Sequence, residues 1–476
     1  MSDLPDLLER FADEGGHRGA ANVFAAAVDA LGERQRRRRT RTVIAAAVAL
    51  TLATGGIAAI AVDAHHDGLK VQTTTPAQTV APAPAPTAKA PTTTLPIVPP
   101  PLAAANDGTW SFAPFQEVAI GGLVAWTGKE VIVAGAGCCE DLGTINLSAY
   151  NPTTKSWRKL PATPLTPRAQ AAGAWTGTEM VVAGGFASAD GSASHATAVT
   201  DGAAWNAATN SWHPIAAMPT TLAGDPTAVW TGREVLVWSS SAALSGSPGR
   251  EVVVAYNPTT NKWRSLPASG LTPRDGAVTV WTGTELVVWS GGTGPAGTAD
   301  ARFSGAGARL DPATNTWRLL PPAPVPARES AVAVWSGHEV LLWGGVTANG
   351  TDVGKGAAYN PVTNQWRALP ASPLRAKVSA AGVWTGRFFI VIGGAANFNL
   401  PTPGPGAAAY DPATNTWTAL PAAPRYPVQP GGPTFAADQR VGAFAVWTGT
   451  AVVLLGGLDF SRQAPRSDGL VWTPAD

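Results

Sequence analysis

A short motif that begins with Trp recurs seven times along the chain and limits the fold more than any other feature. The copies read WTGKE, WTGTE, WTGRE, WTGTE, WSGHE, WTGRF and WTGTA, and they begin at Trp126, Trp175, Trp230, Trp281, Trp335, Trp384 and Trp447. Each copy is followed by an apolar, mostly β-branched run that often ends in Gly-Gly. A spacing near 50 residues with short apolar runs is typical of the blades of a β-propeller.

A second motif lies between successive copies of the first. It reads YNPTTKSW, WNAATNSW, YNPTTNKW, LDPATNTW, YNPVTNQW and YDPATNTW, and its last residues are Trp157, Trp212, Trp263, Trp317, Trp366 and Trp417. Together the two motifs predict four strands per repeat, which we call a to d. Strand a ends at the first Trp, a Thr-Gly turn leads into strand b, strand c ends before Asn-Pro, and the second Trp lies on strand d. Asn, Asp, Pro and Gly supply the conformations that such tight reversals require.

The repeat resembles the kelch-repeat β-propeller family, of the kind found in the central domain of galactose oxidase. The matching features are the Gly-Gly after strand b, the Tyr before the Asn-Pro turn, the Trp on strand d such as Trp263, and an Arg before strand a, as in LTPRAQ and LTPRDG. The resemblance implies an all-β, seven-bladed, kelch-like propeller over residues 107–476. It says little about activity, because one fold serves many functions.

The two ends of this region complement each other. The segment DGTWSFAPF, from Asp107 to Phe115, resembles a strand d without the strands that should precede it. The last repeat stops at VWTPAD, before its own strand d. We therefore expect the first strand to complete the last blade, with Trp110 in the strand-d position, and to close the ring without an open edge.

Three regions precede the propeller. Residues 42–62 carry no charge and are long enough to cross the hydrocarbon core of a bilayer as one helix. The Arg-rich residues before them predict a cytoplasmic N-terminus and an exported propeller at the cell membrane. Residues 63–106, rich in Pro, Thr and Ala, predict an extended linker. Residues 1–41 predict a cytoplasmic tail with two short amphipathic helices that could dock a partner or lie on the membrane.

The alternative for residues 42–62 is a cleaved signal peptide, because Ala59 to Ala61 offers a small-x-small cleavage site. The length of the apolar run and of the segment before it favours an anchor. From Asp107 onward the chain has 23 basic and 23 acidic residues. This balance argues against a nucleic-acid partner, which requires a basic surface.

The spacing of the motifs predicts which end of the propeller binds a partner. The a–b and c–d turns are short and constant, whereas the b–c loops vary and one d–a loop carries a long insertion. Both variable sets emerge on the same face of antiparallel blades, so a ligand is expected there. Seven residues before the strand-a Trp, five blades carry a cation: Arg168, Arg274, Arg328, Lys377 and Arg440. They could attract an anionic ligand, or they could be structural residues that bond loop carbonyls.

The only two cysteines, Cys138 and Cys139, are adjacent in the first b–c loop. An exported location permits oxidation. A vicinal disulfide that stiffens this loop is the favoured hypothesis; two free thiols or a bridge between molecules are the alternatives. No pair has the spacing of a metal site.

The sequence offers little for catalysis, and no catalytic, metal or cofactor-binding residue is assigned. A copper-radical oxidase needs a set of His, Tyr and Cys ligands, but the propeller has only His195, His213 and His338, and four of its Tyr hold the strand-c position. All 19 Trp have a place in the repeat, which explains them by packing between blades. A carboxylate pair near the channel stays open as an enzymatic alternative.

We therefore predict a membrane-anchored, extracytoplasmic propeller that binds a protein or an envelope glycan through its b–c and d–a loops. One alternative is a transmembrane sensor that relays ligand binding to a cytoplasmic regulator. Another is a hydrolase or lyase that acts on acidic glycans.

Overall fold

The structure is a computed structural model, and it describes residues 107–114, 123–135, 145–192, 195–224, 226–242, 249–293, 301–395, 404–425, 436–459, 464–465 and 468–475. The predicted tail, membrane helix and linker lie outside these residues. Of the residues described, none forms a helix with the length and hydrophobicity of a membrane span. The described chain is built from 35 strands, so the all-β prediction is confirmed.

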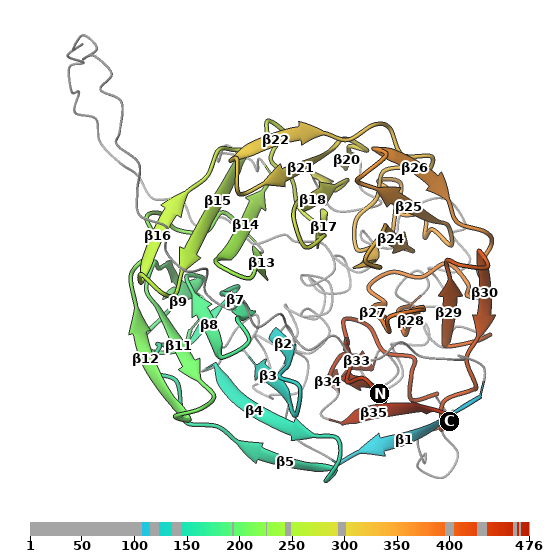
Figure 1. Cartoon of the computed structure of the whole chain (residues 1–476), viewed down its shortest axis with the longest axis horizontal. Coiled ribbons are helices and arrows are strands. Elements are labelled where there is room, and N and C mark those ends of the chain that lie inside the picture. The colour runs from blue at the N-terminus through green and yellow to red at the C-terminus, as the bar shows by residue number, and fades with distance from the viewer. Residues whose placement is uncertain are drawn as a thin grey trace, which may run out of the picture.

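Seven four-stranded antiparallel sheets are arranged as a ring (Figure 1) within the described residues. The first three in chain order, each from its innermost to its outermost strand, are β2 (Leu123–Trp126), β3 (Val131–Gly135), β4 (Asn146–Asn151) and β5 (Ser156–Lys159); β7 (Ala172–Trp175), β8 (Glu179–Ala183), β11 (Gly202–Asn206) and β12 (Ser211–Ile215); and β13 (Pro226–Trp230), β14 (Val235–Ser241), β15 (Arg250–Asn257) and β16 (Lys262–Ser265). The next three are β17 (Val278–Trp281), β18 (Leu286–Trp289), β21 (Gly307–Asp311) and β22 (Thr316–Leu319); β23 (Val332–Trp335), β24 (Val340–Trp343), β25 (Gly356–Asn360) and β26 (Gln365–Ala368); and β27 (Ala381–Trp384), β28 (Phe389–Ile392), β29 (Ala407–Asp411) and β30 (Thr416–Ala419).

The remaining four-stranded sheet combines the first described strand with the last three long ones. Its strands are β31 (Phe444–Trp447), β32 (Val452–Leu455), β35 (Gly469–Pro474) and β1 (Gly108–Ala113). Strand β1 pairs antiparallel with β35 over six residues, with Trp110 opposite Trp472. The indole Nε1 of Trp110 donates to the carbonyl of Pro421, 2.8 Å away in the neighbouring sheet. The N-terminal segment therefore lies where a strand d lies in the other sheets.

Short strands extend some loops beyond the sheets. They are β6 (Arg168–Ala169), β9 (Phe186–Ala187) and β10 (Thr197–Ala198); β19 (Gly292–Thr293) and β20 (Arg302–Phe303); and β33 (Leu458–Asp459) and β34 (Ala464–Pro465). All of them belong to b–c or d–a loops, so the variable end has some regular structure of its own in three of the repeats.

The hydrophobic core lies between neighbouring sheets and not at the centre of the ring. Seven buried clusters each span two adjacent sheets. One of them joins Val131, Val133 and Tyr150 of the first sheet to Val453 and Leu455 of the last. Burial of these apolar side chains from both sheets is the main term that holds neighbours together.

The strand-d Trp residues connect each sheet to the one before it. Six of them donate Nε1 to a backbone carbonyl of the preceding sheet, at 2.7 to 3.1 Å. The ring of the strand-c Tyr packs on the Trp of the same sheet, as Tyr256 does on Trp263 with centroids 5.0 Å apart. These contacts give most Trp residues a structural role and need no bound sugar.

Candidate functional site

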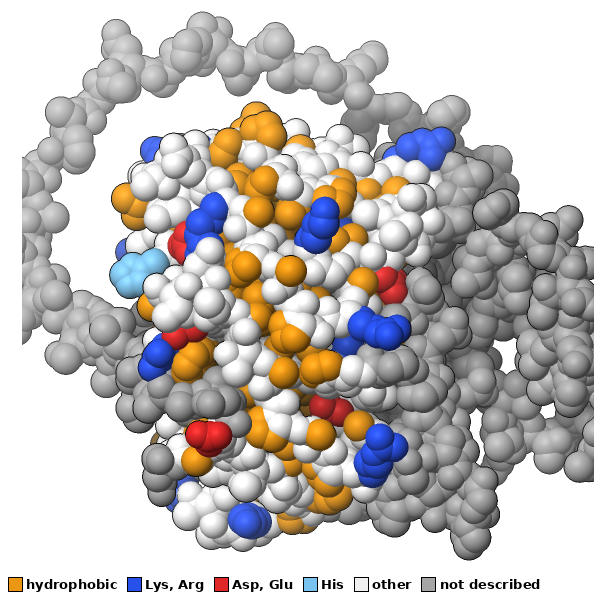
Figure 2. Space-filling model, turned by 90° about the vertical axis from the view of Figure 1, so that its right-hand side faces the viewer, with side chains coloured by type: hydrophobic (Ala, Val, Ile, Leu, Met, Phe, Trp, Pro, Cys, Tyr) orange, Lys and Arg blue, Asp and Glu red, His pale blue; other side chains and the backbone are white. Residues whose placement is uncertain are grey.

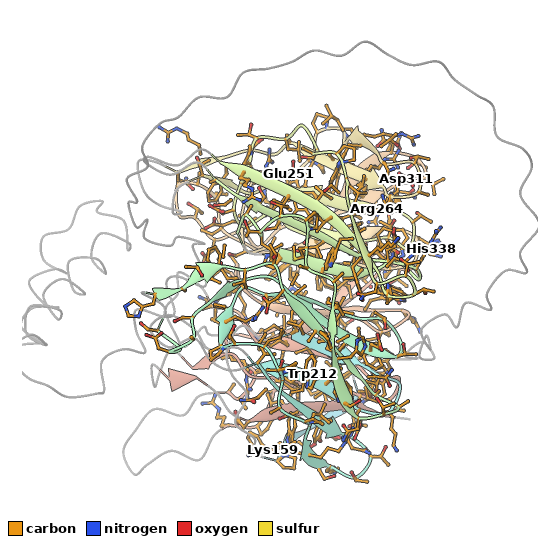
Figure 3. The ribbon with its side chains drawn as sticks, turned by 90° about the vertical axis from the view of Figure 1, so that its left-hand side faces the viewer. Lys159, Trp212, Glu251, Arg264, Asp311 and His338 are labelled. Atoms are coloured by element: carbon orange, nitrogen blue, oxygen red, sulfur yellow. The ribbon has the colours of Figure 1, made fainter. Side chains whose placement is uncertain are left out.

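The two ends of the sheets form two different faces. We call the end with the a–b and c–d turns the turn face, and the end with the b–c and d–a loops the loop face. In the side view of Figure 3, Asp311 of a c–d turn and His338 of an a–b turn lie toward one side of the ring, and Glu251 at the start of a strand c lies further toward the other.

The turn face consists of repeated turns, and each turn makes its side-chain-to-backbone hydrogen bonds within itself. In the first a–b turn, Thr127 Oγ1 accepts a hydrogen bond from the backbone N–H of Glu130 at 2.9 Å, and Gly128 has a φ of 92° that favours glycine. In the first c–d turn, Asn151 Oδ1 accepts from the backbone N–H groups of Thr153 and Thr154. These two turns recur around the ring with little change, which agrees with their constant length.

Ion pairs within each sheet add to this regularity. Arg158 pairs with Glu130 at 2.7 Å, Arg264 with Glu234 at 2.7 Å, Arg367 with Glu339 at 2.6 Å and Arg309 with Glu285 at 3.0 Å. The hydrogen bond from Arg158 holds the pKa of Glu130 below its usual range. Seen from the side, the outer rim carries hydrophobic side chains in a band among scattered Lys and Arg (Figure 2). No single sign of charge dominates the part of the rim in that view.

The five predicted cations are buried on the loop face. Their exposed fractions are 0% for Arg168, 3% for Arg274, 0% for Arg328, 1% for Lys377 and 1% for Arg440. Because all five side chains are buried, none of them presents its charge to a ligand on the surface, as the first hypothesis requires. Their surroundings match the alternative, in which the residue binds loop carbonyls.

Each arginine of this set fastens the base of its own b–c loop. Arg328 shows the arrangement: Nε donates to the carbonyl of Pro326 at 3.0 Å, and Nη1 donates to the carbonyls of Gly344 at 3.0 Å and Lys355 at 2.8 Å. Arg274 and Arg440 donate in the same pattern. Arg168 also pairs with the carboxylate of Asp201. A guanidinium has enough donors in a fixed plane to tie several carbonyls together.

Lys377 departs from this pattern. Its Nζ donates to the carbonyl of Gly406 at 3.3 Å, and burial lowers its pKa to about 8. Asp438, from the d–a loop of the next sheet, lies 1% exposed against Gly406, and burial raises the pKa of its carboxyl group. The ammonium group of Lys377 thus has one carbonyl contact among the described residues, where Arg328 Nη1 has two.

An open hollow lies on the loop face between two neighbouring sheets. Its volume is about 630 Å³. Phe303, from the loop between β18 and β21, lines it beside Pro326 and Ala327, which precede β23. The loop between β24 and β25 supplies the rest, from Thr347 to Asn349 and from Thr351 to Lys355. The lining therefore combines apolar side chains with hydroxyl, amide and charged groups, and three different loops contribute it.

The loop face also carries two acidic residues that the sequence analysis did not single out. Asp275 and Glu329 each follow one of the buried arginines, just before the innermost strands β17 and β23. Glu329 is 3% exposed, and burial followed by the charge of Asp275 raises its pKa to about 8. The signal available in the sequence was an acidic residue beside the repeated Arg in only these two repeats.

The remaining sequence predictions are placed as follows. Cys138 and Cys139 lie outside the described residues, so the vicinal disulfide stays a prediction. His195 Nδ1 is 2.7 Å from Asp190 Oδ2, and Ser188 Oγ donates to the other oxygen of that carboxylate. The carboxylate therefore separates the hydroxyl from the imidazole, which is not the order of a nucleophilic triad. Among the described residues, no three His, Cys, Asp or Glu side chains gather as metal ligands.

Comparison with known proteins agrees with the repeat analysis. Residues 225–457 match the family described as the KLHDC2/KLHL20/DRC7 Kelch-repeats domain. The matched stretch begins before β13 and ends after β32, so it spans the third to the sixth sheet and the first two strands of the last one. A solved structure titled "Structure of YjhT" matches with a TM-score of 0.49 and 16% identity, over 64% of this chain and 98% of that chain. No curated protein sequence matches the chain.

Proposed function

We propose that the chain is a closed, seven-bladed kelch propeller that binds a protein partner through its loop face. The observation that carries this proposal is the hollow of about 630 Å³ between the loop of Phe303 and the loop from Thr347 to Lys355. Kelch-repeat domains, which residues 225–457 match, commonly serve as scaffolds for protein interactions.

The chemistry of the hollow suits a protein surface. Phe303, Pro326 and Ala327 offer apolar area, and Thr351, Asn349 and Lys355 surround it with polar groups. Protein interfaces combine an apolar centre with a polar rim in this way. The hollow is open and shallow in form, whereas small-molecule sites enclose most of their ligand. An envelope glycan is the competing ligand, and it would need exposed aromatic faces that the packed Trp residues do not supply.

The proposed location rests on the sequence. An anchor at residues 42–62 with Arg-rich residues before it would hold the propeller outside the cytoplasm, at the end of the linker of residues 63–106. Protease added to intact cells should then digest the propeller and leave an N-terminal fragment. Release of the linker and the propeller into the medium would support cleavage near Ala59 to Ala61 instead.

The binding proposal can be tested by mapping which face the partner touches. A photoreactive amino acid is placed at Thr351, which is exposed in the hollow, or at Val362, which is 91% exposed in a c–d turn of the same sheet. We expect a specific crosslinked partner from position 351 and none from position 362. The partner is then identified by mass spectrometry and purified.

A matched pair of substitutions completes the test. Thr351→Trp should fill the hollow and weaken binding of the purified partner by about tenfold or more, whereas Val362→Trp should leave it unchanged. Both sites are exposed, so neither change should alter stability by more than about 0.5 kcal/mol. Equal crosslinking from both positions, or binding that survives Thr351→Trp, would reject the loop face as the binding surface.

A further inference from the structure

The hollow lies beside a buried arginine that has no acidic partner in the described part of the chain. Arg328 is 0% exposed, and its Nε and Nη1 donate to the carbonyls of Pro326 and Lys355, both of which line the hollow. Its Nη2 is buried as well and has no hydrogen-bond partner among the described residues. A buried charge without a partner is costly, because the protein interior solvates it poorly.

The second and the last sheet show how such an arginine is neutralised. In the second sheet, the carboxylate of Asp201 accepts from Nη1 and Nη2 of Arg168 at 2.9 Å each, and the Asp201 side chain is 55% exposed. In the last sheet, Asp468 Oδ1 lies 3.5 Å from Arg440 Nη2. Both acids immediately precede strand c, and the backbone carbonyl of each also accepts from its arginine. An acid at this position can therefore reach the buried guanidinium from the solvent side.

The sheet of Arg328 has a second cation where these two sheets have the acid. Lys355 immediately precedes strand β25, and its carbonyl accepts from Arg328 Nη1 at 2.8 Å, as the carbonyls of Asp201 and Asp468 do in their own sheets. Lys355 is exposed at the hollow and makes no ion pair within the described structure. Two positive groups thus meet at this edge of the hollow without the carboxylate that the repeat supplies elsewhere.

Two acidic residues close to this edge do not neutralise it. Asp352 also lines the hollow, but it is partly buried and has a partner of its own. Glu329 follows Arg328 in the chain, and burial, with the charge of Asp275 as a smaller cause, raises its pKa to about 8, so its carboxyl group is mainly protonated at neutral pH. Burial alone lowers the pKa of Arg328 to about 10, so its guanidinium stays charged. The edge is therefore positive.

We propose that the protein partner presents an acidic side chain, Asp or Glu, to this edge of the hollow, where it takes the position that Asp201 has in the second sheet. The inference rests on the proposed function, since it names the chemistry that the partner contributes. The carboxylate would pair with Lys355 and lie against the guanidinium of Arg328, and charge-assisted hydrogen bonds of this kind are stronger than neutral ones. Apolar residues beside the acid would pack on Phe303. The preferred ligand is therefore an acidic segment with apolar neighbours.

Peptides displayed on phage test this chemistry before the partner is identified. The full-length chain is immobilised in mild detergent, random peptides are selected on it, and those that also bind Thr351→Trp are discarded, so that the remaining peptides depend on the hollow. We expect these peptides to contain Asp or Glu beside an apolar residue. Replacement of the acid by its amide in synthetic copies should weaken binding by about tenfold or more. Affinity should also fall as the salt concentration rises, because salt screens an exposed ion pair.

Lys355→Asp tests whether the acid binds at this edge. The change gives the sheet the residue type that the second and the last sheet have at this position. It should therefore weaken binding of the selected peptides by about tenfold or more, and raise the melting temperature by about 2 °C through the new ion pair with Arg328. Lys355→Ala, which only removes a charge, should weaken binding by about threefold and serves if the reversal disturbs folding. Lys159→Asp, at an exposed cation of the outermost strand β5, should change neither quantity.

Failure of this inference can be told apart from failure of the proposed function. If the hollow-dependent peptides contain no acidic residue, or if they bind the Lys355→Asp chain as tightly as the parent chain, the acidic partner is wrong although the hollow still binds. If no selected peptide depends on the hollow, the proposal that the loop face binds a protein is wrong, and this inference is wrong with it.

Discussion

The turn face and the loop face are built from the same sheets, yet they differ in the burial and the partners of their charged side chains. On the turn face, acids such as Glu130 and Glu234 are partly exposed and each meets an arginine of the same sheet. On the loop face, the arginines are buried and bind mainly carbonyls, and the acid Glu329 has an unpartnered oxygen within the described structure. The turn face pairs its acids with arginines, whereas on the loop face Glu329 Oε1 and Arg328 Nη2 are buried without a hydrogen-bond partner among the described residues. Partners are therefore expected on the loop face.

This contrast depends on the pairing of β1 with β35, because both faces are ends of the same ring. The largest effect should come from deletion of residues 1–114, which removes β1. The deletion takes away six paired residues, the packing of Ala113 and the Trp110 contact with Pro421. Loss of a packed Trp alone costs about 3–5 kcal/mol. We expect the free energy of unfolding to fall by at least about 5 kcal/mol, measured by urea denaturation.

Deletion of residues 1–106 is the matched control, since it removes the N-terminal regions but keeps β1. It should retain the melting temperature of the full chain. If deletion of residues 1–114 left the melting temperature unchanged as well, β1 would not be needed to complete the last sheet. The seven-bladed closed ring would then be the wrong description.

The repeat made much of this architecture predictable. Thr127 and Gly128 belong to a turn whose hydrogen bonds and φ are local, so sequence alone specifies it. Asn151 does the same for the c–d turn. Trp110 was recognisable because the strand-d Trp makes the same hydrogen bond in six of the seven sheets. These contacts are short-range or repeated, and a repeated pattern averages out the ambiguity of any single copy.

The loop face was less predictable for two physical reasons. The spacing that singled out Arg168 and Arg328 says that a cation recurs, but it does not say whether the guanidinium faces water or the carbonyls of its own loop. The burial of Glu329 against Gly276 depends on how two neighbouring sheets meet, which no local motif encodes. The hollow depends on the conformations of three separate loops.

The second prediction tests whether the buried arginines hold the loop face together. Arg328→Met should lower the free energy of unfolding by about 3 kcal/mol, because the carbonyls of Pro326, Gly344 and Lys355 lose charge-assisted hydrogen bonds. The exposed Arg318 of the outermost strand β22 is the control, and Arg318→Met should change stability by less than about 0.5 kcal/mol. Both are measured by urea denaturation at neutral pH. Similar losses in the two variants would remove the distinction between a structural and a surface cation.

The smallest expected effect is a difference in how the two faces respond to pH. Folded Glu329 has a pKa of about 8, above its ordinary value of 4.5, so the folded state holds a proton that the unfolded state releases between these values. This group's contribution to stability is therefore present below pH 4.5 and is lost as pH rises toward 8. The glutamine in Glu329→Gln does not titrate. Between pH 5 and pH 8, the free energy of unfolding of this variant should therefore rise relative to that of the parent chain by about 2 kcal/mol.

Glu130 on the turn face should show the opposite trend. Its hydrogen bond from Arg158 lowers its pKa, so its contribution is present above the ordinary value and is lost as pH falls through the lowered one. Glu130→Gln should therefore weaken the protein slightly at neutral pH, by less than about 1 kcal/mol, and converge with the parent chain in acid. Urea denaturation from pH 3 to pH 8 compares both variants with the parent. If the two variants followed the same trend, the faces would not differ in how they hold charge.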